Sequence, residues 1–578
     1  MTVALDAVAR SDRAAPSARR RWSGAARRWR VPLLATASML PLYLVWAVFR
    51  ANGGGDLAAQ EAWARFAAEH GDSAYGLFWF GGLHTANYSL LSPYLMGFLG
   101  VRTVAVVSGL AASWLAAVLF VRSGVRRPLA PALTAAFGLW VNVAAGRVTF
   151  ALGVAFALAA CVVLVGERRL VPAAGYALLA TAGSPVAGLF VVVAGAAYGL
   201  LRDWWRAAVL MVPPFLVVGV TTLLFPFDGE EPMAVGRVWW PAGLGLTVAV
   251  CAPRGRGWRV VRLGALVYVL GVVLSFLLPT PIGSNVERFA LLFAPAVLVA
   301  ALVSSRPPER LPGDRGRLDR LSVLRLPLAR LPWERLRRGG LVLALAGSLF
   351  WVGSGTPVSF VKGSSQVPAW AADTRGLLGA LDRFDADQGR VEVVPAHDHR
   401  EAAVLAPHVN LARGWNTQLD VERGRIFYEG TLTPAAYRAW LDTWAVGLVA
   451  VSDAEPDHSG VAEAALIRGG LSWLEPVWSD AHWRLYRVRD AVPLVSAPAE
   501  AVRAPDSDAY LVVYLPKAAS VTVRIAWSPW LRADNGACLS EDGEFTRLTA
   551  RQAGVFQISS QYDPTVSLPE PKHRPVCR

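Results

Sequence analysis

Long apolar runs recur through residues 31–355, and short charged stretches separate them. The first run, Val31–Phe49, holds nineteen residues without a charge, and a helix of about twenty apolar residues crosses the hydrocarbon core of a bilayer. Gly183-Ser184-Pro185, near the middle of a later apolar stretch, fits either a tight turn or a kink within one long element. The pattern predicts about eleven transmembrane helices, at residues 31–49, 102–121, 129–146, 148–165, 171–184, 185–201, 207–225, 238–252, 260–278, 289–304 and 340–355.

The pattern changes after residue 355, where short strands and short helices alternate. Residues 356–490 combine strand-like runs such as Val446–Val451 with helical runs such as Pro434–Trp444, which predicts a small α/β domain. Residues 491–578 hold short β-rich runs separated by Pro, Gly and Asp, which is typical of a β-sandwich. The expected fold class is therefore a polytopic α-helical membrane protein with a C-terminal α/β domain and β-sandwich.

Composition and charge agree with this division of the chain. Hydrophobic residues make up 54% of the sequence and charged residues 17%, whereas soluble domains hold about a quarter charged residues. The net charge of +14 is uneven, because residues 1–355 carry +19 and residues 356–578 carry −5. A nucleic-acid-binding protein needs a basic stripe on a soluble face. The basic balance belongs to the apolar half instead, so we expect no nucleic acid partner.

The arginines predict an orientation in the membrane. If the N-terminus is cytoplasmic, the predicted inner stretches hold 29 Arg, including a basic tail over residues 1–30 and a loop over residues 305–339. The predicted outer connections hold about six. The positive-inside rule therefore places the multi-pass protein in the cell membrane with residues 356–578 outside. Eight of the sixteen carboxylates of the membrane half fall on outer connections: Asp56, Glu61, Glu69, Asp72, Asp228, Glu230, Glu231 and Glu287.

The four cysteines fit the same division. Cys161 and Cys251 fall in predicted spans, where we expect small buried side chains. Cys538 and Cys577 fall in the predicted outer region, where an oxidising compartment permits a disulfide. Pairing of these two residues and two unpaired thiols both stay open.

The first outer connection, residues 50–101, is the longest in the membrane half, and long ordered loops are usually functional. Three glycines precede Asp56, and Leu57–His70 reads as an amphipathic helix lying along the membrane surface. A carboxylate here, partly shielded from water, suits a general base. Asp is also a preferred N-cap, so the residues alone favour a cap on the helix that follows as the role of Asp56.

Two arginines and one histidine are further candidates at the outer boundary. Arg147 lies between the third and fourth predicted spans, and Arg288 lies just before the tenth. A guanidinium at either position suits a lipid-linked phosphate. Snorkelling to the headgroups, or for Arg288 an ion pair with Glu287, explains the same positions. His84 could bind substrate or carry a proton, although a lone His near aromatic residues is more often only hydrogen-bonded.

Other motifs are weak or absent from the sequence. His397-Asp398-His399 offers two imidazoles, but no further ligands stand at a recognised metal-site spacing. The chain has no phosphate-binding Gly-rich loop with its Lys, no Gly-x-Ser-x-Gly elbow and no dinucleotide fingerprint. ATP-driven pumping and serine-hydrolase chemistry are therefore disfavoured, and the sequence indicates no certain cofactor.

Together these features resemble the GT-C superfamily of membrane glycosyltransferases, in particular large actinobacterial members that build envelope polysaccharides. The resemblance rests on Asp56 just after the first span, a helix in a long first outer loop, about eleven spans and a C-terminal outer domain with a sandwich-like end. Two short phrases add to it, from Gly81-Gly82-Leu83-His84 to Tyr88-Ser89-Leu90-Leu91-Ser92-Pro93, and Gly283-Ser284-Asn285 with Arg288.

The resemblance implies an inverting transfer of a sugar from a polyprenyl-phosphate donor to an envelope glycan or glycolipid acceptor, at the outer face of the bilayer. Asp56 would be the base, and Arg288 or Arg147 would bind the donor phosphate. His84, Tyr88, Glu61, Asp72 and Asn285 would be substrate-binding candidates. Many members carry Asp-x-Asp or paired acids here, but Leu57 and Ala58 follow Asp56. Glu61 or Asp72 would have to supply a second carboxylate for a divalent metal, which stays a weak candidate cofactor.

Two other functions stay open. A transporter or flippase of lipid or sugar commonly shows internal repeats or charges at the centres of its spans, and this sequence shows neither. A non-catalytic scaffold that binds envelope glycans through the outer region is the other alternative.

Overall fold

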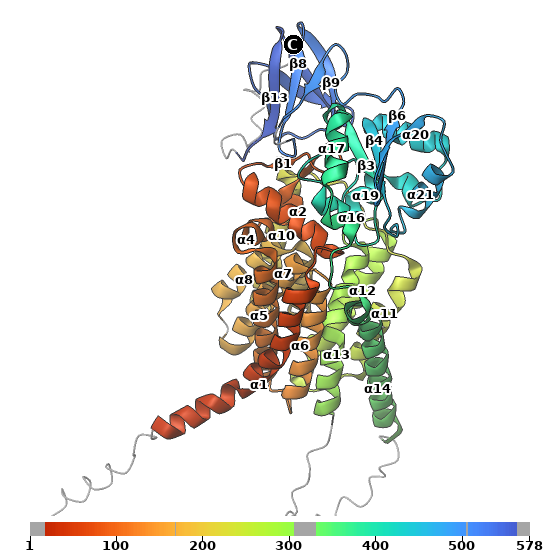
Figure 1. The fold of residues 1–578 in the computed structure, drawn as a ribbon. Helices are drawn as coiled ribbons and strands as arrows, with labels where there is room; N and C mark the ends of the chain where they lie inside the picture. The colour runs from red at the N-terminus through yellow and green to blue at the C-terminus, as the bar shows by residue number, and fades with distance from the viewer. Residues whose placement is uncertain (1–17, 168, 306–330, 505–506, 563–578) are drawn as a thin grey trace, which may run out of the picture.

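The computed structural model describes residues 18–167, 169–305, 331–504 and 507–562. A bundle of helices carries a separate region of strands and short helices at one end, which we call the head (residues 363–562) (Figure 1). The start of α1, the end of α13 and the start of α14 lie at the opposite end of the bundle. The bundle helices are α1 (Ala18–Val45) with its π-helical continuation η1 (Trp46–Arg50), α5 (Val101–Arg122), α6 (Leu129–Ala144), α7 (Val148–Glu167), α8 (Leu170–Gly183), α9 (Pro185–Leu200), α10 (Trp204–Leu224), α11 (Val235–Cys251), α12 (Arg256–Leu277), α13 (Glu287–Ser304) and α14 (Leu331–Ser354).

A helix covers each of the predicted apolar runs. In the part of the chain that the structure describes, seven helices are long and apolar enough to cross a membrane, which supports a polytopic membrane protein. The remaining four runs form shorter apolar helices, α6, α8, α9 and α11, so the count of eleven spans stays a prediction. Gly183-Ser184-Pro185 is a turn between two separate helices, because Ser184 has extended backbone angles and caps both.

The first connecting loop, residues 50–101, contains α2 (Asp56–Glu69), the hairpin β1 (Tyr75–Gly76) and β2 (Leu83–His84), α3 (Thr85–Tyr88) and α4 (Ser92–Leu99). The helix predicted after Asp56 forms as α2 and packs between the bundle and the head, whereas its place relative to a membrane surface stays a prediction. Its Leu57 and Ala64 pack among the bundle helices, whereas its Trp63 and Phe66 pack against the head. Helix α2 is therefore buried between the two regions, because apolar side chains cover both of its faces.

The first part of the head is an α/β domain. Strands β3 (Arg390–Val393), β4 (Val446–Ser452), β5 (Leu474–Ser479) and β6 (Trp483–Val488) form one sheet in the order β3-β4-β6-β5, with β3 parallel to β4 and the other pairs antiparallel. Side chains alternate across β4, since Leu448 and Ala450 pack toward α17 (Arg375–Arg383) and Val449 packs toward α20 (Pro434–Thr443) and α21 (Val461–Arg468).

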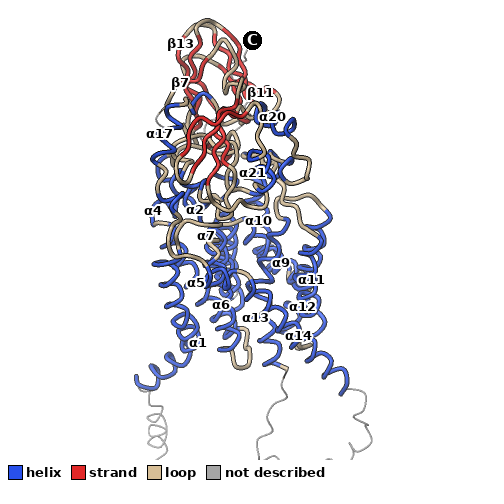
Figure 2. Tube along the Cα trace, turned by 45° about the vertical axis from the view of Figure 1, so that its right-hand side comes forward, coloured by secondary structure: helices blue, strands red, loops and turns tan. Residues whose placement is uncertain are grey.

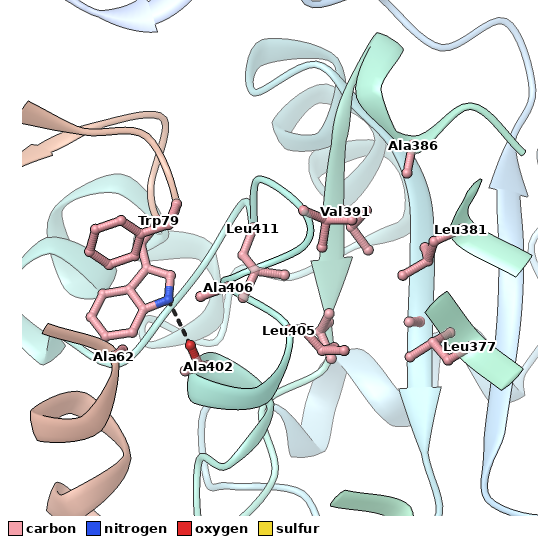
Figure 3. Packing of buried hydrophobic residues seen from close by; sticks show 14 of the residues in the cluster. Ala62, Trp79, Leu377, Leu381, Ala386, Val391, Ala402, Leu405, Ala406 and Leu411 are labelled. Carbon is pink, nitrogen blue, oxygen red and sulfur yellow. Dashed lines mark hydrogen bonds between the residues drawn. The ribbon is translucent and has the colours of Figure 1, made fainter. Parts of the chain in front are cut away.

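One hydrophobic core joins this sheet to the first connecting loop. Figure 3 shows Trp79 of the loop lying beside Ala402 and Ala406 of the head, with Leu411, Val391 and the side chains of α17 continuing the core. The indole Nε1 of Trp79 donates a hydrogen bond of 3.1 Å to the carbonyl oxygen of Ala402. The loop is thus part of the core of the head.

The second part of the head is a sandwich of two antiparallel sheets, and Figure 2 shows these strands gathered at the far end of the molecule. One sheet has the order β10-β13-β8-β7 and the other the order β11-β12-β9. Their facing side chains, Val513 and Phe556 from one sheet and Val523 and Leu548 from the other, share one core. The strands are β7 (Glu500–Val502), β8 (Leu511–Leu515), β9 (Ala519–Ala526), β10 (Leu531–Ala533), β11 (Cys538–Asp542), β12 (Phe545–Ala550) and β13 (Gly554–Ser560).

Candidate functional site

A cavity of about 750 Å³ lies between the helix bundle and the head. Its wall comes from α2, α3, the start of α7, the α8–α9 turn, α10, residues 281–288 before and at the start of α13, and residues 415–418 of the head. Helices α8 and α9 are shorter than the roughly twenty residues that span a bilayer, and the turn between them lines the cavity. The cavity is therefore placed where short helices end beneath the head.

Asp56 and Arg147 form an ion pair at the cavity wall, with Arg147 Nε 2.9 Å from Asp56 Oδ2. Gly146, with φ of +78°, places Arg147 beside α2. A side chain there would bring its Cβ 2.6 Å from the backbone nitrogen of Leu57, so only glycine allows the two segments to approach. The pair is 30% exposed on both sides, which leaves Asp56 accessible from the cavity.

The alternative role of Asp56 as an N-cap is wrong. Gly55 is the N-cap of α2, no side chain caps this end, and Asp56 is the first helical residue. The backbone N–H of Gly55 donates to the carbonyl oxygen of Asp398 at 2.7 Å. Arg400 donates to the backbone carbonyl and the side-chain oxygen of Asn52. The head therefore fixes the glycine-rich segment that precedes Asp56.

A hydrogen-bond network lies beside Asp56, around the next turn of α2. Gln60, one helical turn later, accepts hydrogen bonds from the backbone N–H (3.2 Å) and Oγ1 (2.7 Å) of Thr149. Gln60 Nε2 donates to the hydroxyl of Tyr88, whose ring stacks on Trp63 with centroids 5.2 Å apart. Burial raises the pKa of Tyr88 to about 12. The protonated phenol also interacts with Thr149, so Tyr88 belongs to the same network as Gln60.

Arg288 provides a cation in the same cavity that has no counterion among the described residues. Within the described residues it has no ion pair within 4.0 Å and donates no hydrogen bond, and its guanidinium carbon lies 5.5 Å from the centroid of the Phe150 ring. The predicted alternative, a pair with Glu287, is absent from the described chain, since Glu287 lies 3.9 Å from Arg237 instead. An unpaired guanidinium in a cavity is suited to an anionic ligand.

The segment before Arg288 packs closely on the α10–α11 connection. Gly283 has φ of +39°, and a Cβ there would lie 1.8 Å from the carbonyl oxygen of Glu231. Ser284 Oγ donates to Glu231 Oε1 at 2.7 Å, and Asn285 is buried and lines the cavity. Burial raises the pKa of Glu231, against the lowering effects of Ser284 and Arg288. Glycine and serine in this motif therefore place Glu231 and Arg288 in one cavity.

The head closes the cavity with residues 415–418. Trp415 stacks on His399, with ring centroids 3.5 Å apart and planes at 11°. The side-chain Nε2 of Gln418 donates to the carbonyl oxygen of Pro281 at 3.2 Å. The backbone carbonyl oxygen of Gln418 accepts from the backbone N–H of Glu230. These bonds connect the closing segment of the head to the same loops that carry Glu231 and Arg288.

The other half of the cavity is apolar. It reaches Leu189 and Val192 of α9 and Pro214, Phe215 and Val218 of α10. Phe215 and Val218 are 59% and 41% exposed on the flank of the bundle. The cavity therefore runs from charged groups beneath the head to an apolar wall that includes side chains on the outside of the bundle.

Three of the predicted site residues lie outside this cavity. His84 is buried, its Nδ1 donating to the carbonyl oxygen of Ala74 at 3.1 Å and its Nε2 accepting from Ser528 at 3.2 Å. Burial lowers the pKa of His84 to about 4. Glu61 points to the other side of α2, where burial raises its pKa and Arg102 and Arg400 oppose this effect. Asp72 is exposed beyond the end of α2.

The remaining candidates concern metals and cysteines. Glu69, His70 and Asp508 form a group whose ligand atoms lie within 4.8 Å of one another and could hold a metal ion, although Arg65 already pairs with both carboxylates. In the His397-Asp398-His399 motif, His397 is exposed, whereas His399 is buried, stacks on Trp415 and lies 3.6 Å from Glu401, so the two imidazoles have different surroundings. Cys538 is disulfide-bonded, and its predicted partner Cys577 lies outside the described residues. Cys161 and Cys251 are free thiols.

Comparison with models of protein families, with curated proteins and with solved structures found no match for this chain. The structure brings Asp56, Arg147, Arg288, Tyr88 and Asn285 into one cavity. Gln60, Glu231 and the closing segment 415–418 also line this cavity and were not among the predicted site residues. The four-residue spacing from Asp56 could have indicated Gln60, whereas Glu231 was one of eight outer acids with nothing to distinguish it.

Proposed function

We propose that the protein is an inverting glycosyltransferase of the GT-C type, which transfers a sugar from a polyprenyl-phosphate donor to an envelope glycan or glycolipid at the outer face of the cell membrane. One observation carries this proposal. A single cavity joins a carboxylate, an unpaired guanidinium and an apolar wall that extends to the flank of the bundle. A lipid-linked sugar phosphate has the same three parts, namely a polar sugar, an anion and an apolar chain.

The anionic end of the donor fits Arg288. A guanidinium binds phosphate oxygens through two parallel hydrogen bonds and keeps its charge at any physiological pH. The phenol of Tyr88, which acts electrostatically with Arg288, supplies a further hydrogen-bond donor. As the bond between the anomeric carbon and the phosphate oxygen breaks, both groups stabilise the negative charge that develops on the leaving phosphate. The apolar chain then extends along α9 and α10 toward the lipid.

Asp56 is the proposed base. Its carboxylate takes the proton of the acceptor hydroxyl while the acceptor oxygen bonds to the anomeric carbon on the face opposite the phosphate. A single displacement of this kind inverts the configuration at that carbon. The ion pair with Arg147 fixes the carboxylate of Asp56 at the cavity wall. Residues 415–418 line the cavity on the head side, from which a glycan acceptor would approach.

A divalent metal remains a weak candidate cofactor. The group that could hold one, Glu69, His70 and Asp508, does not line the cavity, so we assign it no step in transfer.

Two substitutions in a strain that lacks the endogenous protein test the proposal. We expect Asp56→Asn and Arg288→Gln each to abolish one surface glycan, measured by mass analysis of the envelope. Loss of the general base at Asp56 costs about 10²–10⁴ in rate, and loss of Arg288 removes the group that binds the donor phosphate. Asp72→Asn is the matched control, since it removes an exposed carboxylate of the same loop outside the cavity. Protein levels are compared by immunoblotting.

The same experiment separates the alternatives. A flippase needs no proton acceptor at Asp56, so an intact glycan in the Asp56→Asn strain with loss in the Arg288→Gln strain would favour lipid transport. Intact glycan in both strains, at normal protein level, would leave only the scaffold function.

A further inference from the structure

Glu231 is a carboxylate of the cavity that the proposed transfer does not use. It lies in the connection between α10 and α11 and is held at three points. Its backbone N–H donates to the carbonyl oxygen of Thr280 at 3.0 Å, its backbone carbonyl packs on Gly283, and its Oε1 accepts from Ser284 at 2.7 Å. A side chain fixed in this way presents its second oxygen in a defined place on the cavity wall.

The charged side chains of the cavity are one ion pair and two groups that lack an ion-pair partner among the described residues. Asp56 and Arg147 neutralise each other. Glu231 and Arg288 each have no ion pair within 4.0 Å among the described residues, although each affects the other electrostatically. Ser284, which holds Glu231, precedes Arg288 by four residues, so one short segment places both groups. Among the described residues, the cavity therefore holds one cation and one anion that lack an ion-pair partner.

These two groups require different chemistry in a ligand. The unpaired guanidinium is suited to an anion, whereas a partly buried carboxylate is satisfied by hydroxyl or amine donors and repels a second carboxylate. Burial raises the pKa of Glu231, which means that water satisfies this carboxylate poorly and that a donor from a ligand would be favoured there. The ligand that matches both groups has a phosphate next to a ring with free hydroxyl groups.

We propose that Glu231 binds hydroxyl groups of the transferred sugar and restricts the donor to sugars without a carboxylate. This inference rests on the proposed function, because it assumes that the phosphate of the donor lies at Arg288. It assigns Glu231 to recognition of the sugar and leaves proton transfer to Asp56.

Binding to the full-length protein in detergent tests this assignment with three probes: farnesyl phosphate, farnesyl phosphoryl glucose and farnesyl phosphoryl glucuronate. For the unaltered protein we expect the glucosyl probe to bind at least tenfold more tightly than the glucuronate probe. Glu231→Gln should weaken binding of the glucosyl probe about tenfold or more, the usual cost of a hydrogen bond to a charged group. It should not weaken binding of farnesyl phosphate, because the substitution removes a negative charge from the cavity that holds Arg288. The same substitution should also reduce the difference in affinity between the glucosyl probe and the glucuronate probe.

Two further variants serve as controls. Glu230→Gln changes the neighbouring carboxylate, which lies 3.9 Å from Arg425 and does not line the cavity, so all three affinities should stay the same. Arg288→Gln should weaken the binding of all three probes. Glutamine at position 231 can still accept from Ser284, and equal thermal unfolding of the variant and the unaltered protein verifies the fold.

The outcomes distinguish the two proposals. If farnesyl phosphate does not bind the unaltered protein, the proposed function fails. If it binds through Arg288 but Glu231→Gln weakens all three probes equally, or changes none, then Glu231 does not recognise the sugar and this inference alone is overturned.

Discussion

At the scale of single residues, close backbone approach decides which side chains enter the cavity. Gly146 lets the end of α6 touch the first turn of α2, which brings Arg147 to 2.9 Å from Asp56. Asp56 and Arg147 are 91 positions apart in the chain. A charged residue at each position was visible in the sequence, but their pairing depends on a glycine that no charge pattern identifies.

Substitution of Gly146 measures this approach. Gly146→Ala adds a Cβ at 2.6 Å from the nitrogen of Leu57 and also places Ala at a positive φ. We expect a loss of stability of about 2–4 kcal/mol, from about 1 kcal/mol of backbone strain and about 1–3 kcal/mol of overpacking. Thermal unfolding of the purified protein gives the value.

Gly124→Ala is the matched control, because Gly124 has φ of +68° and its Cβ would meet nothing within 4 Å. The control should lose only the contribution of backbone strain. Equal losses for the two variants would contradict a specific contact between α6 and α2.

At the scale of elements, a buried polar network supports the segment that closes the cavity. Arg413 donates to both oxygens of Asp420, on α19 (Thr417–Arg423), and to Glu463 on α21. Glu392 on β3 is fully buried, lies 3.9 Å from Arg413 and accepts no hydrogen bond among the described residues. Helix α19 begins at Thr417, so the network that holds Asp420 of this helix also fixes residues 415–418 at the cavity. One arginine cannot neutralise three carboxylates, so we expect one of them to bind a proton.

Stability of the head should therefore fall as the pH rises. Burial and the neighbouring Glu463 raise the pKa of Glu392 well above its usual value of 4.5, so the folded state binds a proton that the unfolded state has released. The stabilisation is complete below pH 4.5 and is lost as the pH rises through the raised pKa. A tenfold higher proton affinity of Glu392 in the folded state corresponds to about 1.4 kcal/mol of stability.

Glu392→Gln keeps the shape of the side chain and removes its titration. We expect a higher melting temperature than the unaltered protein at pH 8, and a difference that shrinks at pH 4.5. Parallel curves of melting temperature against pH would show that Glu392 is not the group that titrates.

At the scale of the whole molecule, the head and the bundle are interlocked. Trp530 Nε1 of the sandwich donates to the carbonyl oxygen of Leu224 at the end of α10, at 2.7 Å. Arg423 of the α/β domain donates to the carbonyl oxygens of Phe80 and Gly82 in the first connecting loop. His84 of the same loop accepts from Ser528 of the sandwich. Both parts of the head therefore contact the loop that carries Asp56.

Acid should weaken this docking through His84. Its pKa is about 4 in the folded protein, against an ordinary value of 6.5, so the unfolded state binds the proton more readily. The contribution is fully present above pH 6.5 and is lost as the pH falls toward 4, by at most about 3 kcal/mol. A protonated ring could no longer accept from Ser528.

Thermal unfolding followed by Trp fluorescence between pH 4 and pH 7 checks this prediction. The unaltered protein should lose stability on acidification more steeply than His84→Gln, which carries no titrating group at this position. Identical slopes for the two proteins would assign the acid sensitivity to other groups.

The sequence by itself determined the helices and the division of the chain. The run predicted at 102–121 became α5 at Val101–Arg122, and the strand predicted at Val446–Val451 became β4 at Val446–Ser452. Such elements are predictable because hydrophobic periodicity is local, and because a segment that must leave water shows this in its own composition. The same local pattern identified Asp56, Arg147 and Arg288 as candidates, because charged residues at the ends of apolar runs are easily recognised.

Only the tertiary structure decided what these residues do together. It buried α2 between bundle and head, paired Asp56 with Arg147, left Arg288 without a counterion among the described residues and brought Glu231 and residues 415–418 to the same cavity. It also placed His84 in a structural contact away from that cavity. The physical reason is that a cavity is the space left by segments distant in sequence, and its shape follows from backbone contacts such as Gly146 on Leu57 and Gly283 on Glu231. No local pattern of residues records those contacts.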